Sequence, residues 1–406
     1  MSYQDHSKLP TTAQKAALAG SYGAPSSTNE YVTDDDPRLT GTGGAIASAA
    51  AVALFGSGRD GAAAFDGSSS VTGYSLSGST YIRNVLYDAH HTTVTVSNSV
   101  AIDMAGFRFK AFSVTLGNSV RIHNNGNTTT STTGGHGANP HLNATSTTGA
   151  TFWGGASGGA GRTTIGNGIG GIATGSAASY GGRGGSGGRC KWTSSSVGGL
   201  AGVLSLVAST AMHYYGDDWE ILLGFPYCRN GTTLLQCAGG TGGGSGGVQL
   251  STSATSMGAP GGGGVLAIAI KELSCGTGCV FSANGGSGAG TPLAVSAGVG
   301  GCGGGGGGLL VGFIGEIIGS NLPSFTADGG NGGTGAANAG IAWGEGGYGG
   351  TGGKITVFVG TNNVGGTPTV TANGGTKGAN VDTGTPPAWN NTDGAAGSAF
   401  YKEGLS

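Results

Sequence analysis

The stretch VTANGG, residues 370–375, closes a unit that the chain repeats, and this unit decides the fold. Three earlier segments share its form: LQCAGG at 235–240, FSANGG at 281–286 and FTADGG at 325–330. The final glycines of the four segments, at 240, 286, 330 and 375, follow one another at intervals of 46, 44 and 45 residues. A fixed period of this size is typical of stacked repeat architectures.

A second apolar run begins 21 residues before each of these final glycines. The four runs are WEILLGF from Trp219, VLAIAIKEL from Val265, LLVGFIGEII from Leu309 and KITVFVG from Lys354. In the last run Ile355, Val357 and Val359 alternate with the residues between them, which is the period of a strand. Because short linkers rich in turn-forming residues follow, each unit predicts a strand, a turn and a second strand.

A long glycine-rich excursion follows the second strand, at residues 239–264, 285–308 and 329–353. Each excursion has a glycine-rich arm, a less glycine-rich middle and a returning arm. One interpretation is that the arms are extended, polyproline-II-like segments packed side by side, because backbones without Cβ atoms can approach closely. The middles would then gather at one end as loops. The other interpretation is a set of disordered Gly/Ser linkers.

The composition argues against a compact globular enzyme. Glycine accounts for 93 of 406 residues, and charged residues make up 9% against a typical share of ~25%. The net charge is −2 without a basic block, so we expect no nucleic-acid partner. The start, MSYQDHSKLP, does not resemble a signal peptide, and no apolar run reaches the ~20 residues of a membrane span. We therefore expect a soluble protein that is not secreted through a signal peptide.

Changes in pattern divide the chain into six segments. These are an N-terminal segment at 1–40 with a short helix at 7–20, a linker at 41–82, short alternating strands at 83–126, a glycine-rich insertion with loops at 127–218, the repeat at 219–375 and a glycine-rich tail at 376–406. We predict an all-β protein of short-strand, parallel β-helix-like repeats with glycine-rich polyproline-II-like arms and one short N-terminal helix.

Residues 83–126 alternate in the manner of strands. Strands are expected at 92–96, 100–104, 107–112, 113–116 and 119–126, as rungs of a parallel β-helix or as part of a sandwich. The expected inward pairs are Val94 with Val96, Ile102 with Met104, Phe107 with Phe109, Val114 with Leu116, and Val120 with Ile122. Because Ala105 lies 21 residues before Gly126 in the ending RIHNNG, we count residues 105–126 as a divergent first copy of the repeat.

Two segments carry a family resemblance. The run TTAQKAALAG…GAPSSTNEYVTDDDPRL resembles a segment near the N-termini of tailed-bacteriophage fibre proteins. The run RNVLYDAHHTTVTVSNSVAIDMAGFRF…SVRIHNNGN resembles the β-helical start of phage fibre and tip proteins, and a looser likeness to glycine-rich tail-fibre adhesins continues to the C-terminus. The resemblance implies a homotrimer whose N-terminal segment attaches to the virion. The attachment candidates are Leu18, Tyr31, Asp36, Pro37, Arg38 and Leu39.

Residues with catalytic chemistry form only weak patterns. Asp217, Asp218 and Glu220 with His213 suggest either a carboxylate pair for glycoside cleavage or a polar turn beside a strand. Two histidine groups, His90–His91 near Asp88 and His136 with His141, lack metal-binding spacing. The pattern CxxxC at Cys275 and Cys279 is a weak zinc signal, and buried thiols or a local disulfide are the alternatives. We predict no catalytic residue, metal or cofactor.

Recognition by loops is the function that the sequence favours. Aromatic rings suit such contacts because they offer a large area at low entropic cost. The contact candidates are Trp153, Tyr180, Trp192, Tyr214, Tyr215, Trp343, Tyr348 and Trp389, although several of them could instead be core residues. The expectation is a non-enzymatic fibre or fibre-tip adhesin of a virion, with virion proteins and a host polysaccharide or outer-membrane protein as partners. The alternatives are a head fibre or capsid decoration protein, a polysaccharide depolymerase, and a secreted bacterial surface protein.

Overall fold

The fold is known from a computed structural model. The chain divides into two units, Met1–Ala53 and Leu54–Ser406. The structure describes residues 54–85, 87–128, 181–188, 190–191, 195–196, 227–230, 233–236, 239–247, 258–289, 298–337, 343–382 and 391–404. All of these belong to the second unit, and almost none are helical. The helix expected at 7–20 lies outside them.

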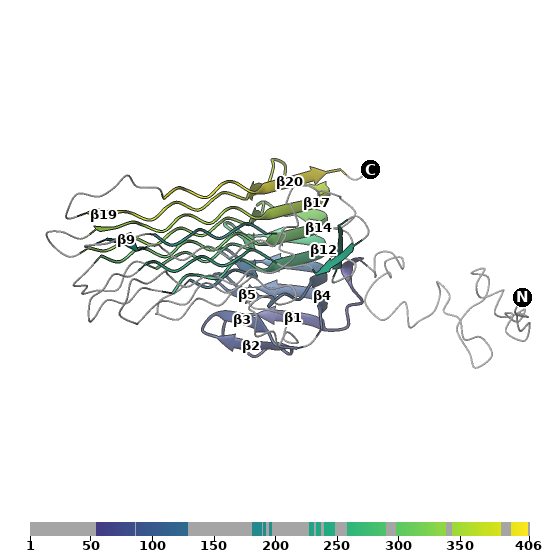
Figure 1. The fold of residues 1–406 in the computed structure, drawn as a ribbon. Helices are drawn as coiled ribbons and strands as arrows, with labels where there is room; N and C mark the ends of the chain where they lie inside the picture. The colour runs from purple at the N-terminus through teal and green to yellow at the C-terminus, as the bar shows by residue number, and fades with distance from the viewer. Residues whose placement is uncertain are drawn as a thin grey trace, which may run out of the picture. The chain divides into compact units, whose positions relative to one another are not determined.

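Two seven-stranded sheets form the body of the second unit (Figure 1). Sheet I is parallel throughout, with the order β1 (Gly61–Phe65), β4 (Ala89–Val96), β6 (Phe109–Leu116), β12 (Val265–Cys275), β14 (Leu309–Ile318), β17 (Lys354–Asn362) and β20 (Ser398–Glu403). Sheet II has the order β18 (Thr369–Thr371), β15 (Ser324–Thr326), β13 (Val280–Ser282), β7 (Arg121–His123), β5 (Ala101–Asp103), β3 (Thr80–Arg83) and β2 (Tyr74–Ser77). It is parallel except between β2 and β3.

Within the repeated copies, the chain passes from sheet I to sheet II. A strand of sheet I leads through a short turn into a strand of sheet II, as in β4–β5, β6–β7, β12–β13, β14–β15 and β17–β18. Equivalent residues of successive copies pair in register: Leu266 pairs with Leu310, which pairs with Ile355. The prediction of a mostly β protein with a repeated strand, turn and strand is confirmed for these copies.

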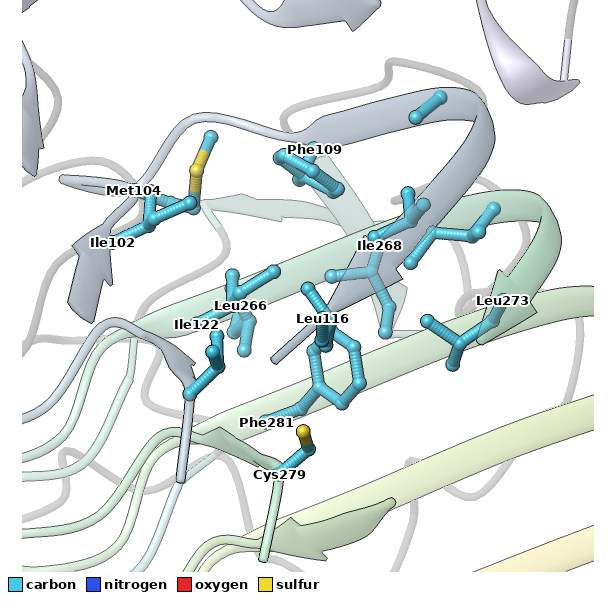
Figure 2. Close-up of a cluster of buried hydrophobic side chains, with 14 of the residues drawn as sticks. Ile102, Met104, Phe109, Leu116, Ile122, Leu266, Ile268, Leu273, Cys279 and Phe281 are labelled. Carbon is cyan, nitrogen blue, oxygen red and sulfur yellow. The ribbon is translucent and has the colours of Figure 1, made fainter. Parts of the chain in front are cut away.

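One hydrophobic core lies between the sheets (Figure 2). Ile102, Ile122 and Phe281 come from sheet II and approach Leu266 and Ile268 of sheet I. All ten residues of the five inward pairs predicted for 83–126 are buried. One boundary differs from the prediction, because the strands expected at 107–112 and 113–116 form the single strand β6.

The prediction that the LQCAGG copy forms the rung before β12 is wrong. Strands β10 (Tyr227–Asn230) and β11 (Thr233–Gln236) form a separate antiparallel pair, and β12 instead pairs with β6, in the divergent copy at 105–126. Only two residues separate β10 from β11, a spacing that suits an antiparallel hairpin, whereas a parallel neighbour requires a long crossover. Sheets I and II therefore include strands from both sides of the 127–264 stretch. WEILLGF lies outside the described residues.

Candidate recognition surface

Glycine-rich arms leave the sheets and run side by side (Figure 1). The described arms are 181–188, 239–247, 258–264, 283–289, 298–308, 327–337, 343–353, 372–382 and 391–397. Between one arm and a given neighbour, backbone hydrogen bonds recur at every third residue. The N–H groups of Gly182, Gly185 and Gly188 donate to the carbonyls of Gly307, Gly304 and Gly301 at 2.6, 2.7 and 2.7 Å. The arms are thus held together by their own main chains.

Glycine is required where the arms meet. A Cβ atom added at Gly304 would fall inside 3.0 Å of the carbonyl oxygen of Gly330, and one at Gly185 would meet the carbonyl of Tyr348 equally closely. Because the obstacle is backbone of the next arm, no side-chain rotation relieves it. The high glycine content is therefore a packing requirement of these arms.

The arms end together, at what we call the distal end. There the N–H of Gly247 donates to Gly188 at 3.0 Å, the N–H of Gly300 donates to Gly247 at 2.9 Å, and Val299 and Ala336 exchange two bonds of 2.8 Å. These residues flank three different excursions. The chain segments between the arms therefore begin and end beside one another although they are far apart in sequence.

A small sheet adds further ties at the distal end (Figure 1). Its order is β19 (Val381–Asp382), β16 (Trp343–Gly344), β8 (Cys190–Lys191) and β9 (Ser195–Ser196), and all its pairs are antiparallel. Trp343 pairs with Lys191 on one side and Asp382 on the other. β16 is paired on both sides, and Trp343 is only 2% exposed.

A buried ring of polar groups lies next to β16. The Glu345 side chain is 0% exposed, and its Oε1 accepts a hydrogen bond of 2.9 Å from the backbone N–H of Asn391. The Asn391 side chain donates to Gly378 O at 3.0 Å and accepts from Asn380 Nδ2 at 3.3 Å. The N–H of Gly346 donates to Asn380 Oδ1 at 2.8 Å, which closes the ring. Sequence reasoning missed this ring, although a carboxylate inside a glycine arm was a visible signal.

No family model, curated protein or solved structure matches this chain. Within the described residues, no helix has the length and apolar character needed to cross a membrane. The function therefore has to be inferred from the geometry of the chain itself.

The predicted contact residues divide into two groups. Trp343 is buried and takes the core alternative, whereas Tyr348, in the 343–353 arm, is partly exposed. Six others lie outside the described residues: Trp153, Tyr180, Trp192, Tyr214, Tyr215 and Trp389. The attachment candidates Leu18, Tyr31, Asp36, Pro37, Arg38 and Leu39 lie outside them as well, as do His136, His141, His213, Asp217, Asp218 and Glu220.

One exposed aromatic residue escaped the sequence prediction. Tyr87 is 44% exposed, and the guanidinium carbon of Arg59 lies 4.1 Å from its ring centroid. It lies two residues before the first residue of β4, Ala89. Its sequence surroundings gave no periodic signal that would have separated it from a core tyrosine.

Asp103, His123 and Ser282 stand side by side on β5, β7 and β13 in the order of a hydrolytic triad. A serine nucleophile needs a base within about 3 Å, but Ser282 Oγ is buried and has no hydrogen-bond partner. Burial lowers the pKa of His123, and the charge of Asp103 offsets part of that effect. The row lacks the contact that would activate the serine.

Other titratable groups of the described residues make structural contacts. Asp88 forms an ion pair with Arg108, and Ser57 Oγ lies 3.4 Å from His90 Nδ1. The described residues contain no group of three or more His, Cys, Asp or Glu arranged to hold a metal ion. The thiols of Cys275, Cys279 and Cys302 are free and buried.

Proposed function

We propose that this chain is a virion protein of a tailed bacteriophage, a fibre or fibre-tip adhesin without enzymatic activity. In this proposal the loops at the distal end bind the host cell surface, through a polysaccharide or an outer-membrane protein. Residues 1–40 attach the chain to fibre, baseplate or capsid proteins, and the fibre is a homotrimer. No cofactor, metal or nucleic acid takes part.

The observation that carries this proposal is the convergence of the arms. The described flanks of several excursions meet at one end through backbone hydrogen bonds, as between Gly188, Gly247 and Gly300. Backbone bonds do not depend on the residues of the connecting loops. A surface built in this way tolerates sequence change in its loops while its support stays fixed, which suits a protein that must follow changes in a host receptor.

The finer architecture that we propose is a parallel β-helix that carries polyproline-II arms. Support for the β-helix comes from two parallel sheets joined rung by rung through short turns. Support for the arms comes from hydrogen bonds at every third residue, since polyproline II has three residues per turn. Positive φ occurs in turns such as Gly278 and Gly365, and no described glycine of the arms has it.

Competition for adsorption tests the role in recognition. Host cells are first incubated with the purified full-length chain, and adsorption of the phage particle is then measured. We expect the chain to block adsorption, and a variant with residues 383–390 replaced by a Gly/Ser segment of equal length to block it less. Tyr87→Ala is the control for an exposed aromatic residue beside β4 and not at the distal end. Loss of blocking by Tyr87→Ala alone would move the recognition site away from the distal end.

The place of the chain on the particle separates the two virion roles. A cryo-EM map of the virion with matching density at the tail tip would agree with an adhesin. Density on the capsid, together with unimpaired adsorption of particles that lack the chain, would make it a head fibre or decoration protein instead.

A further inference from the structure

We propose that Glu345 is a positioning residue that ties the 343–353 arm to Asn391 and so fixes the described flanks of residues 383–390 at the distal end. This inference rests on the proposed function, because it assigns the residue that shapes the recognition surface. It concerns Glu345 together with Asn380 and Asn391, whose roles no sequence pattern indicated.

Glu345 joins three arms. It belongs to the 343–353 arm, its backbone carbonyl accepts the N–H of Gly301 at 2.9 Å, and its Oε1 accepts the N–H of Asn391 at 2.9 Å. The first bond reaches the 298–308 arm and the second reaches the 391–397 arm. Only the second depends on the side chain, so a substitution at this position removes the tie to Asn391 and leaves the backbone tie in place.

Asn391 and Asn380 close the ring, and they lie on the two sides of residues 383–390. Asn380 precedes β19, and Asn391 is the first described residue after it. The two side chains bond to each other, and each also bonds to backbone of the arms, Asn391 to Gly378 and Asn380 to Gly346. Both flanks of residues 383–390 are therefore fixed by the same ring.

Because the ring is buried, substitution of its residues should be costly. Glu345 is fully buried and Asn391 is 4% exposed, so a partner removed from either is not replaced freely by water. Alanine at 345 leaves the Asn391 N–H without its acceptor. Glutamine keeps an oxygen at the same place, so it should retain the bond without the charge.

The ring lies apart from the hydrophobic core. None of its residues contributes to the core between sheets I and II, which comprises side chains such as Ile268, Ile314 and Phe281. Loss of the ring should therefore loosen the distal end without unfolding the sheets. This separation allows a positioning role to be told from a general loss of stability.

Hydrogen exchange of the full-length chain is the direct test. With Glu345→Ala we expect the amide of Asn391 to exchange about 10- to 100-fold faster, the effect of leaving one buried N–H without its acceptor. Amides of β12 should be unchanged, and Glu345→Gln should restore most of the protection. Glu316→Ala is the matched control. Glu316 also accepts a hydrogen bond from one asparagine, Asn363, but it lies in β14 of sheet I and not in a glycine arm. If Glu345→Ala folds poorly, Asn380→Ala tests the same ring.

Adsorption competition with the same variants separates the positioning role of Glu345 from the proposed role of the distal end in recognition. Faster exchange at Asn391 together with weaker competition supports the positioning role in recognition. Faster exchange with undiminished competition overturns the link to recognition and counts against the distal end as the binding surface. Unchanged exchange in both Glu345→Ala and Asn380→Ala overturns the inference, whatever the competition shows.

Discussion

Asn284 Oδ1 accepts a hydrogen bond of 2.8 Å from the backbone N–H of Asp328, one rung further along the stack. The same relation links Asn125 to Asn284 and Asp328 to Asn373, at 2.7 Å each. These are the Asn and Asp residues of the repeated segments NNG, ANGG and ADGG. The ladder couples successive rungs at the point where the chain leaves sheet II and enters the glycine arms.

Asn284→Ala should lower the free energy of unfolding by about 1 kcal/mol, because the N–H of Asp328 loses its acceptor. Urea denaturation measures the change. Asp328→Asn is the matched control, since asparagine occupies this ladder position in the neighbouring rungs and keeps an acceptor for Asn373. An unchanged midpoint for Asn284→Ala would mean that the ladder contributes nothing to stability.

Gly304→Ala should destabilise the arms strongly. Its Cβ would meet the backbone oxygen of Gly330, so the cost should exceed the ~1–3 kcal/mol of ordinary overpacking. Gly312→Ala in β14 is the control, because its Cβ would lie 3.3 Å from the side chains of Ile268 and Val357, which can shift. Thermal melting compares the two. Equal melting temperatures for both variants would contradict close packing of the arms.

The ladder also explains what the sequence could and could not predict. The repeat at 281–286, 325–330 and 370–375 places a core residue, a buried alanine and a ladder residue in a fixed order, so its period revealed the stacked rungs. The LQCAGG copy has Ala238 at the ladder position and therefore offers the next rung no side-chain acceptor. Its glycines matched the period, but its described residues Leu235 and Gln236 belong to β11, outside sheets I and II.

The distal end was harder to predict because its ties are long-range. Trp343 pairs with Lys191 and Asp382. No local pattern distinguishes a tryptophan buried by such pairing from one displayed on a loop. Glu345 likewise meets Asn391 only because two arms are adjacent, and adjacency of glycine arms leaves no periodic trace in the sequence.

Arg83→Met should cost about 1.5–3 kcal/mol, because it removes the ion pair with Asp60 and the hydrogen bonds that the guanidinium donates to the carbonyls of Tyr87 and Asp88. The Arg83 side chain is 1% exposed, forms an ion pair of 3.1 Å with Asp60 and lies 4.8 Å from the ring centroid of Tyr74. Arg59→Met is the control, since Arg59 is half exposed and also pairs with Asp60, and it should cost less than about 1 kcal/mol. Chemical denaturation measures both losses. Asp60→Asn should cost less in the Arg83→Met background than in the natural chain, because the Arg83–Asp60 pair is already lost there; equal costs in both backgrounds would mean that the two residues are not coupled.

Acid should destabilise the sheets through His91. Burial lowers the pKa of His91 to about 4; Asp60 opposes this and Arg83 adds to it. The unfolded chain therefore takes up the proton first, near pH 6.5. The contribution of His91 to stability is constant above that pH and falls as the pH drops toward 4, by about 3 kcal/mol over the interval. Urea denaturation between pH 7 and pH 4 measures this slope.

His91→Gln identifies the residue responsible for the slope. The His91 ring lies in the core beside Tyr74, whose Oη is 3.3 Å from His91 Nε2, and beside the rings of Phe65 and Phe109, so protonation places a charge at a position shielded from water. Glutamine cannot take up that proton, and the variant should lose most of the pH dependence. A smaller slope should persist, because burial also lowers the pKa values of His90 and His123. If the variant kept the full slope, the acid sensitivity would belong to those two histidines.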